Sequence, residues 1–295
     1  MWWILQSILN WIRSLVLRFI KTGAIPTHIA FIMDGNRRYA KKRKIARREG
    51  HFLGFEKMME TLKWCLDLGI TEITVYAFSI NNFKRSEEEV NDLMDLIRQK
   101  FKSFLEKLDE LKNDGICIRV FGNLSLLPED VCQIIARCMI ATKDNNKIIL
   151  NIACPYTSKD ELTHAIKDIA KGIKHNNILP EDINEDLISD CLYTYKSSNP
   201  DLLIRTSGVF RLSDFLMWQV SNTCIYFTDV LWPEFTSWKF LAAIFYYQRS
   251  DSQKVMNNLK PIVHNSNKIA MFVDKIHHER ETIIENISNN YEQLF

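Results

Sequence analysis

Short apolar runs alternate with longer amphipathic segments between residues 23 and 250. The runs are apolar at successive positions, which is typical of strands that are buried on both faces of a parallel sheet. The pattern therefore predicts an α/β fold, in a single domain over residues 23–250, with a mostly parallel central sheet of about six strands flanked by helices. The predicted strands lie at 28–33, 72–78, 116–121, 147–153, 201–204 and 223–227.

Helix-start signals mark two of the segments between these strands. Ser86-x-x-Glu89 and Ser158-x-x-Glu161 match the capping box, in which the first side chain accepts a backbone hydrogen bond and the last returns one. The helix that begins at Ser86 has an apolar stripe that continues to Lys112, a length of roughly 39 Å at 1.5 Å per residue. We therefore predict one long helix there.

The first 22 residues combine a wide apolar surface with a narrow polar stripe. Arg13 and Arg18 make a membrane-spanning helix costly, and no basic segment precedes the apolar part as in a signal peptide. Tryptophans near the start suit the depth of lipid headgroups. We expect residues 1–22 to form an amphipathic helix on a membrane surface. A helix packed on the core or on a partner subunit is the alternative.

Residues 251–295 are polar, with Asn and Ser clusters around a patchy helical pattern at about 266–290. They predict a helical appendage at the C-terminal end of the 23–250 domain. The pattern suggests no chemistry for this part of the chain.

The composition limits the possible classes of protein. A chain of 295 residues with 46% hydrophobic residues can bury a large core. The net charge is +2, so positive charge is only local, and eight of the twelve residues 37–48 are Lys or Arg. Seven cysteines without a C-x-x-C pair indicate reduced core thiols in a cytosolic setting, not a disulfide framework or a zinc site.

The segment after the first predicted strand carries the strongest chemical signal. Asp34-Gly35-Asn36 follows the strand directly, and Arg37 and Arg38 begin a helix. A helix N-terminus favours anions because its backbone N–H groups are unpaired and its dipole is positive. A carboxylate there suits Mg²⁺, and arginine side chains bind phosphate oxygens. The sequence therefore predicts a site for a metal ion and a diphosphate.

A second set of polar residues follows other predicted strands. In an open parallel sheet, ligands bind beyond the carboxyl ends of the strands. Arg205 ends an apolar strand, and a buried arginine needs an anionic partner. Together Arg85, Arg205, Arg211 and Ser213 could hold one diphosphate while the segment that begins at Asp34 holds another.

Six motifs closely resemble, in order, the signature blocks of the cis-prenyltransferases, a family that includes undecaprenyl and dehydrodolichyl diphosphate synthases. The resemblance covers roughly residues 26–245, and the six motifs are highly specific when they occur together. The chain resembles the eukaryotic dehydrodolichyl diphosphate synthases more closely than the undecaprenyl diphosphate synthases. The motifs are MDGNRRYA, GH at 50–51, YAFSINNFKRS, IRTSG, RLSDFLMWQ and YFTDVLWPEF.

The resemblance implies a Mg²⁺-dependent elongation reaction. Farnesyl diphosphate ionises, the double bond of isopentenyl diphosphate attacks, and a proton is lost to leave a cis double bond. Repetition gives a long dehydrodolichyl diphosphate for dolichol and protein glycosylation. The apolar stripe of the 87–112 helix, together with Met58, Met59 and Leu62, would line a tunnel for the growing chain.

The resemblance also implies roles for individual residues, with Asp34 as the metal ligand that helps the allylic diphosphate leave. The implied catalytic residues are Asp34, Asn36, His51 and Asn82. The implied residues around the allylic diphosphate are Gly35, Asn36, Arg37, Arg38, Arg47 and His51. The implied residues for isopentenyl diphosphate are Ser79, Arg85, Arg205, Arg211 and Ser213.

Some positions depart from the family pattern. Asn81 and Val209 each replace a usual Glu, Asn123 replaces a usual Asp, and Cys224 stands where bacterial members carry a Glu near the metal. Cys224 is a feature shared with eukaryotic catalytic subunits, which depend on an accessory subunit of the Nogo-B-receptor type. The resemblance therefore implies a heteromer, placed on the cytosolic face of the endoplasmic reticulum membrane.

The alternatives to a catalytic cis-prenyltransferase are a non-catalytic accessory subunit, a trans-prenyltransferase and a nucleic-acid-binding protein. Asn81 and Val209 leave a non-catalytic accessory subunit open, although such subunits typically lose the Asp-Gly-Asn and arginine positions kept here. A trans-prenyltransferase would need a D-D-x-x-D pair, and the chain has no Asp-Asp dipeptide. Nucleic-acid binding would depend on the 37–48 run alone, without the aromatic residues of a stacking platform, so we expect no nucleic-acid partner.

Overall fold

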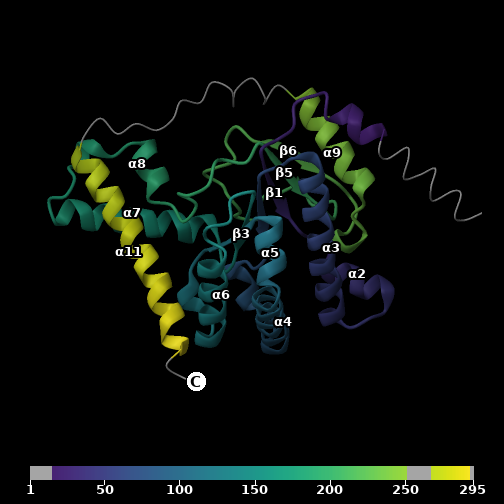
Figure 1. The fold of residues 1–295 in the computed structure, drawn as a ribbon, viewed down its shortest axis with the longest axis horizontal. Coiled ribbons are helices and arrows are strands. Elements are labelled where there is room, and N and C mark those ends of the chain that lie inside the picture. Colours follow the sequence, from purple (N-terminus) through teal and green to yellow (C-terminus); the bar gives the residue numbers. More distant parts are fainter. Residues whose placement is uncertain (1–14, 251–266, 293–295) are drawn as a thin grey trace, which may run out of the picture. The chain divides into compact units, whose positions relative to one another are not determined.

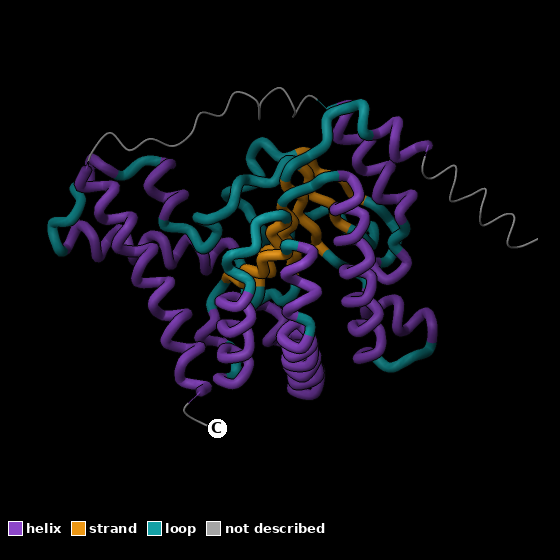
Figure 2. Tube along the Cα trace, in the orientation of Figure 1, coloured by secondary structure: helices purple, strands orange, loops and turns teal. Residues whose placement is uncertain are grey.

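The computed structural model describes residues 15–250 and 267–292 (Figure 1). Six strands form one sheet: β1 His28–Ile32, β2 Glu72–Tyr76, β3 Ile116–Phe121, β4 Ile148–Ala153, β5 Leu202–Arg205 and β6 Cys224–Phe227. Their order is β3-β4-β2-β1-β5-β6, and the pairings β1–β5, β3–β4 and β5–β6 are parallel. Figure 2 distinguishes these strands from the helices around them. The predicted α/β fold with a mostly parallel sheet of six strands is confirmed.

The helices occupy the segments between the strands and the end of the chain. The α-helices are α2 Asn36–Arg43, α3 Arg47–Leu68, α4 Glu87–Glu106, α5 Leu108–Asp114, α6 Glu129–Ala141, α7 Ser158–Lys174, α8 Glu185–Asp190, α9 Ser237–Arg249 and α11 Asn267–Glu292. The short 3₁₀ helices are η1 Ile80–Lys84, η2 Leu124–Leu126, η3 Pro180–Asp182 and η4 Trp232–Glu234.

The six predicted strands are all present, with ends shifted by no more than two residues. Every residue of β1 and of β5 is buried. This double-sided burial is the physical reason for their continuous apolar sequence, because helices cover both faces of a parallel sheet.

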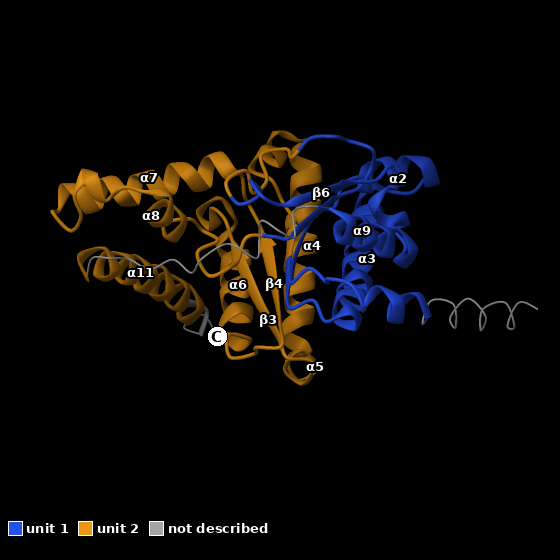
Figure 3. Ribbon diagram, turned by 90° about the horizontal axis from the view of Figure 1, so that it is seen from above, with its two compact units in different colours: residues 1–73, 200–211, 219–259 blue, residues 74–199, 212–218, 260–295 orange. Residues whose placement is uncertain are grey.

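Contacts divide the chain into two compact units (Figure 3). Unit 1 consists of residues 1–73, 200–211 and 219–259, and unit 2 consists of residues 74–199, 212–218 and 260–295. The division into an N-terminal helix, a 23–250 domain and a C-terminal appendage stays a prediction.

Unit 1 has an aromatic core supplied by the segment after β6. Trp232 is buried, stacks on Phe235 with ring centroids 5.6 Å apart, and lies 5.9 Å from the ring of Phe31 in β1. Its indole Nε1 donates a hydrogen bond to the backbone oxygen of Gly54 in α3 at 2.7 Å. A buried indole requires such an acceptor. This segment therefore holds α3 against the core of unit 1.

The prediction of one helix over 86–112 is wrong, because the segment contains two helices. At Lys107 the backbone leaves the helical conformation, with φ −112° and ψ 28°, and α5 begins at Leu108. Ser86 caps α4, since its hydroxyl accepts a hydrogen bond from the backbone N–H of Glu89 at 3.4 Å. The Glu89 carboxylate accepts a hydrogen bond from Arg85 at 2.8 Å.

The predicted cap at Ser158 is also wrong, by one residue. Thr157 is the N-cap of α7, and its hydroxyl accepts a hydrogen bond from the backbone N–H of Asp160 at 3.4 Å. Glu161 is fully buried, where its carboxylate accepts a hydrogen bond from the Tyr156 hydroxyl at 2.5 Å. A buried polar network therefore uses the glutamate that the local pattern assigned to the cap.

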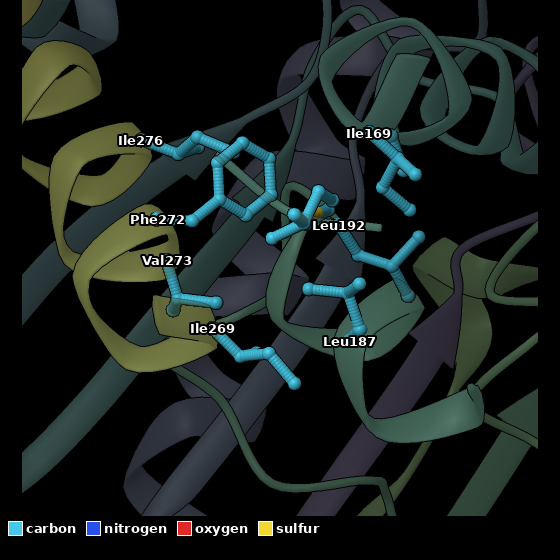
Figure 4. Close-up of a cluster of buried hydrophobic side chains, with 10 residues drawn as sticks. Ile169, Leu187, Leu192, Ile269, Phe272, Val273 and Ile276 are labelled. Atoms are coloured by element: carbon cyan, nitrogen blue, oxygen red, sulfur yellow. The ribbon is translucent and has the colours of Figure 1, made fainter. Parts of the chain in front are cut away.

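The helix α11 packs against other helices of unit 2. It contacts α6 and α8, and its apolar residues join a buried cluster with residues of α7 and α8 (Figure 4). A Cβ at Gly172 in α7 would overlap the ring of Phe272, so a larger residue there would displace this ring from the cluster. Arg280 fixes the polar side of this contact, because it donates to the backbone oxygen of Leu192 at 2.7 Å and pairs with Asp168 at 3.1 Å.

His277 makes the docking of α11 sensitive to pH. Its ring stacks on Tyr195 at 3.8 Å, and its Nε2 donates to the backbone oxygen of Asp190 at 2.8 Å. Burial lowers the pKa of His277 below its usual 6.5, and the positive charge of Arg280 acts in the same direction. The hydrogen bond to Asp190 opposes this shift but does not cancel it. Because the folded pKa is depressed, the stability that the neutral ring contributes is present above pH 6.5 and is lost progressively as the pH falls below it, when a positive charge must be buried beside Arg280.

We expect the amides of α11 to exchange with solvent faster at about pH 5.5 than at about pH 7.5, after correction for intrinsic rates. Hydrogen–deuterium exchange would measure this. The variant His277→Phe keeps the ring stacking but does not titrate, so it should show a smaller difference between the two pH values. An equal pH dependence in both proteins would contradict this role of His277.

The described part of the N-terminal segment is anchored to unit 1. Residues 15–20 are helical, and Ile20 is buried. The side chain of Gln248 in α9 donates to the backbone oxygens of Ile20 and Ala24 at 2.8 and 3.0 Å. No helix in the described residues has the length and apolar character needed to cross a membrane. The rest of the predicted amphipathic helix, residues 1–14, lies outside the described residues.

Unit 2 contains a cavity of about 890 Å³. Residues of β3, α6, the segment 193–197 and the C-terminal half of α11 line it, and its walls are mainly apolar. No residue of the apolar stripe on α4 lines this cavity. The tunnel expected along that stripe stays a prediction.

Candidate functional site

Gly35 turns the chain sharply between β1 and α2. It has φ 115°, and a Cβ at this position would meet Leu231 at 3.0 Å, so a residue other than glycine would be strained. Its backbone oxygen accepts the hydrogen bond of the first helical turn, from Tyr39 N–H at 2.8 Å. Asp34 therefore stands at the N-terminus of α2, where the helix dipole favours negative charge.

Hydrogen bonds to its backbone N–H and oxygen hold Asp34 against the end of β5. The strands β1 and β5 are neighbours, with Ile32 opposite Arg205. The buried hydroxyl of Thr206 accepts from the Asp34 N–H at 3.1 Å and donates to the Asp34 backbone oxygen at 2.7 Å. Trp232 N–H donates to the same oxygen at 3.0 Å. These contacts fix the backbone of Asp34 before any ligand binds.

Two arginines contact the Asp34 carboxylate through the same oxygen. Nη2 of Arg205, a residue only 3% exposed, lies 2.9 Å from Asp34 Oδ2, and Nη2 of Arg38 lies 3.3 Å from it. Burial raises the pKa of Asp34, but hydrogen bonds from Arg205 and Ser207 and the charges of the two arginines outweigh it and hold this pKa below 3.8. The carboxylate is therefore ionised at neutral pH, while a third of the side chain stays exposed.

The anionic partner expected for the buried Arg205 is a residue of the chain itself. Arg205 pairs with Asp34 and also donates from Nη1 to the backbone oxygen of Arg211. Asp34 and Arg205, which are predicted to bind two different diphosphates, are therefore in direct contact. Their assignment to the two diphosphates stays a prediction.

Thr206 and Ser207 belong to this cluster, although the sequence-based assignment did not include them. Ser207 has a positive φ of 83°, and its backbone oxygen accepts from Arg38 Nη1 at 2.9 Å. Its hydroxyl accepts from the other terminal nitrogen of Arg38. The IRTSG motif contains both residues, but a hydroxyl that orients a neighbouring side chain cannot be told in sequence from an ordinary turn residue.

Asn36 begins α2 and packs against two glycines of α3. A Cβ on Gly50 would lie 2.7 Å from the backbone oxygen of Asn36, and a Cβ on Gly54 would overlap its side-chain amide. Glycines four residues apart share one face of a helix, so this spacing lets α2 approach α3 closely. Asn36 Oδ1 is buried without a hydrogen-bond partner in the described part of the chain. His51 follows Gly50 and is partly buried.

The remaining predicted cations of this segment are at the surface of unit 1. Arg37 in α2 and Arg47 at the start of α3 are both exposed. Further along α2, Lys42 and Arg43 face the carboxylate of Glu234 at 2.8 and 3.7 Å. Unit 1 therefore brings Asp34, Arg38 and Arg205 into contact and surrounds them with additional positive charge.

The predicted residues Ser79, Asn82 and Arg85 lie in unit 2, around η1. The Ser79 N–H donates to Asn82 Oδ1 at 3.0 Å, and the Ser79 hydroxyl accepts from Asn81 N–H at 3.2 Å. Ser79 and Asn82 therefore shape a tight turn through their own hydrogen bonds. Arg85 ends this turn and pairs with the buried Glu89 at 2.8 Å. Asn81 is exposed.

Arg211 and Ser213 fall into different units although they are close in sequence. Arg211 is exposed and belongs to unit 1. Ser213 belongs to unit 2, has φ 52°, and its backbone oxygen accepts from the Tyr76 hydroxyl at 3.4 Å. Cys224 lies at the start of β6 beside Leu202, at the strand ends opposite those near Asp34.

The donor set suits a metal that arrives with its substrate. Within residues 15–250 and 267–292, no group of three or more His, Cys, Asp or Glu side chains is arranged to hold a metal ion. Mg²⁺ is commonly bound by one or two carboxylates, with phosphate oxygens and water completing its coordination. The ionised, partly exposed Asp34 fits such a site as its single protein carboxylate.

Comparison with known proteins identifies relatives over most of the chain. Residues 32–254 match the family described as undecaprenyl diphosphate synthase. A dehydrodolichyl diphosphate synthase complex subunit of Homo sapiens is 52% identical over 250 residues, covering 85% of this chain and 75% of the relative. A subunit of the same description from Schizosaccharomyces pombe is 43% identical, covering 83% and 93%. Lavandulyl diphosphate synthase from Lavandula x intermedia, solved with dimethylallyl diphosphate, has a TM-score of 0.73 at 32% identity, covering 77% and 96%.

Proposed function

The chain belongs to the undecaprenyl diphosphate synthase family of cis-prenyltransferases, and we propose that it condenses isopentenyl diphosphate repeatedly onto an allylic diphosphate. The likeness to dehydrodolichyl diphosphate synthase complex subunits supports dehydrodolichyl diphosphate, for dolichol and protein glycosylation, as the product. We propose farnesyl diphosphate as the allylic substrate.

The arrangement of Asp34 with Arg205 and Arg38 at the N-terminus of α2 carries this proposal. The barrier of the reaction is charge separation as the diphosphate leaves, and fixed positive groups lower that barrier because they need not reorganise. Arg37 and Arg38 bind the leaving diphosphate together with the N–H groups of the first turn of α2. Arg205 keeps the carboxylate of Asp34 ionised and oriented.

Asp34 holds Mg²⁺ in this proposal, because it is an ionised carboxylate beside the N–H groups that would bind the phosphates. A bound Mg²⁺ supplies positive charge that stabilises the leaving diphosphate. Asn36 and His51 complete the allylic site, with Gly35 and Arg47 beside the phosphates. The close packing of Asn36 on Gly50 holds this side of the site at a fixed distance from α3.

We assign isopentenyl diphosphate to Ser79, Arg85, Arg205, Arg211 and Ser213, with Asn82 as a catalytic residue between the substrates. The support in unit 2 is the rigid turn of η1, whose reciprocal hydrogen bonds between Ser79 and Asn82 fix the start of the segment that presents Arg85. The Arg85 guanidinium is held at 2.8 Å by the buried Glu89, so its position is set before a substrate binds.

We assign an accessory subunit of the Nogo-B-receptor type to the outer edge of β6. This strand ends the described sheet, and an unpaired edge with aromatic side chains is a typical interaction surface. Phe210 is 78% exposed and lies 5.3 Å from the ring of Phe227, and Tyr226 lies 5.4 Å from that of Tyr246. The description of both curated relatives as complex subunits supports a heteromer.

We place the protein at the cytosolic face of the endoplasmic reticulum membrane. Its seven cysteines are free and buried, which suits a reducing compartment. Leu15 and Phe19 are exposed on the helical residues 15–20, and the sequence before them is rich in tryptophan and aliphatic residues. Such a composition favours the membrane interface.

The test is the incorporation of labelled isopentenyl diphosphate onto farnesyl diphosphate with Mg²⁺. The reaction would contain this chain alone, the chain with the accessory subunit, or Asp34→Ala with that subunit. We expect a long cis-polyprenyl product only with the accessory subunit, and none with Asp34→Ala. Full turnover by the single chain would contradict the heteromer. No product in any mixture would instead favour the accessory role that Asn81 and Val209 leave open.

A further inference from the structure

Residues 37–48 form a surface of concentrated positive charge on a nearly neutral protein. Eight of these twelve residues are Lys or Arg, whereas the net charge of the whole chain is +2. All eight are exposed, and Ala40 is the only buried residue of α2. The helix has no acidic residue in its first turn and three basic residues in its last. This surface is more positive than binding one diphosphate requires.

Three of the cations are not engaged by the proposed catalytic site or by Glu234. Arg37, Arg38 and Arg47 belong to the allylic site, and Lys42 and Arg43 face Glu234. The other three are exposed, and within residues 15–250 and 267–292 no carboxylate pairs with them; they are Lys41, Lys44 and Arg48. We call them the outer cations of α2, since Lys41 lies in the last turn of α2, Lys44 caps this helix, and Arg48 follows in the first turn of α3. Uncompensated exposed cations of this density favour an extended anionic partner.

Exposed apolar residues occur on the same side of unit 1. In Figures 1 and 3, the helical residues 15–20 and α2 both lie at the right-hand side of this unit. Phe19 is 67% exposed and Leu15 is 42% exposed on that helix. The buried Ile20 and the hydrogen bonds from Gln248 attach the helix firmly to α9. The two surfaces therefore have a fixed relation to one another within the unit.

We infer that the outer cations of α2 bind the anionic headgroups of the same membrane surface that the N-terminal segment enters. The combination is that of a two-signal membrane contact, in which apolar side chains enter the interface and basic residues select anionic lipid. A nucleic acid would not use the exposed Phe19 and Leu15 in this way. The inference rests on the proposed membrane attachment, and it adds a selection among membranes by charge.

The contact has a further consequence for the proposed reaction. The active-site residues Arg37 and Arg38 stand on the same short helix as Lys41, so binding α2 to headgroups places the entrance for diphosphates near the membrane surface.

The inference is tested by flotation of the full chain, with its accessory subunit, on vesicles of phosphatidylcholine with and without phosphatidylserine. The variant Lys41→Glu/Lys44→Glu/Arg48→Glu changes only residues that the proposed catalytic site does not use. Its matched control is Lys102→Glu/Lys112→Glu/Lys174→Glu, which reverses three exposed lysines elsewhere and gives the same net charge.

Removing one cation near an anionic surface weakens binding about fivefold, and three glutamates add repulsion to the loss of three cations, so the first variant should bind phosphatidylserine vesicles at least about 100-fold more weakly than the wild type. The control should bind like the wild type, and added salt should weaken the wild type most. Binding to phosphatidylcholine alone should be the same for all three proteins. Equal binding of both variants to phosphatidylserine would overturn the inference.

Two further measurements separate this inference from the proposed function. If the outer cations only attract diphosphate substrates, the first variant will lose kcat/KM in the absence of vesicles, and that result overturns the inference. If no protein binds any vesicle, membrane attachment fails as well. Turnover measured in detergent, without vesicles, reports on the cis-prenyltransferase activity independently of membrane attachment and of lipid selection.

Discussion

Asp34→Asn is expected to lower kcat by roughly 1,000-fold and to destabilise the fold by about 2 kcal/mol. Asparagine keeps the shape of the side chain but removes the charge that would hold a metal ion and that compensates Arg205. Removing one partner of a buried ion pair commonly costs about 3–5 kcal/mol, and we expect a smaller cost here because the Asp34 side chain is a third exposed. Turnover with the accessory subunit and chemical denaturation would measure the two effects.

The double variant Asp34→Asn/Arg205→Met is the matched control. It removes both charges, and the unbranched methionine can fill most of the buried space of the arginine stem. Stability should return to within about 1 kcal/mol of the wild type, whereas turnover should stay low. If Asp34→Asn alone were as stable as the wild type, the ion pair would not stabilise the fold. Recovery of turnover in the double variant would show that Asp34 is not needed for catalysis.

The ion pair also predicts how the difference in unfolding free energy between the wild type and Asp34→Asn depends on pH. The folded pKa of Asp34 lies below its usual 3.8, so the stabilisation is complete above pH 3.8 and is lost as the pH falls through the folded value. The difference in unfolding free energy between the wild type and Asp34→Asn should therefore narrow in acid. Denaturation at a series of pH values would show this. A constant difference would assign the effect to packing.

The strands could be predicted because each is buried on both faces, and continuous apolar runs are a strong local pattern. The helix boundaries were less secure, since an apolar stripe continues across Lys107 although the backbone does not. Ser158 illustrates the same limit, because the glutamate that a capping box requires is used by the buried Tyr156. Local patterns predict which segments are helical better than where one helix ends.

The composition of the site could be predicted, but its contacts could not. Asp34 and Arg205 each follow or end an apolar run, and this position predicts that they lie at strand ends, where ligands of parallel sheets bind. The sequence could not show that β1 and β5 are neighbours, because strand order is decided by tertiary packing over more than 150 residues of chain. Thr206 and Ser207 were missed for the same reason, since their role is to hold Asp34 and Arg38 across that pairing.

Gly50→Ala is expected to lower kcat/KM by about 100-fold, although it places a better helix former in α3. A Cβ at Gly50 would lie 2.7 Å from the backbone oxygen of Asn36 and 2.9 Å from the Cβ of Ala40. Neither atom belongs to a flexible side chain, so α2 as a whole must move away from α3. That movement would displace Asp34 and Arg38 from the geometry that they share with β5.

Gly54→Ala provides the comparison on the same face of α3. Its Cβ would meet the side-chain amide of Asn36, which can rotate away, so α2 can stay in place. Loss of activity in Gly54→Ala would therefore report on Asn36 itself, and Asn36→Ala should lower kcat/KM to the same extent. Gly50→Ala should be the more severe variant because it also moves the carboxylate. If Gly50→Ala kept full activity, the close packing of α2 on α3 would not be what positions the site.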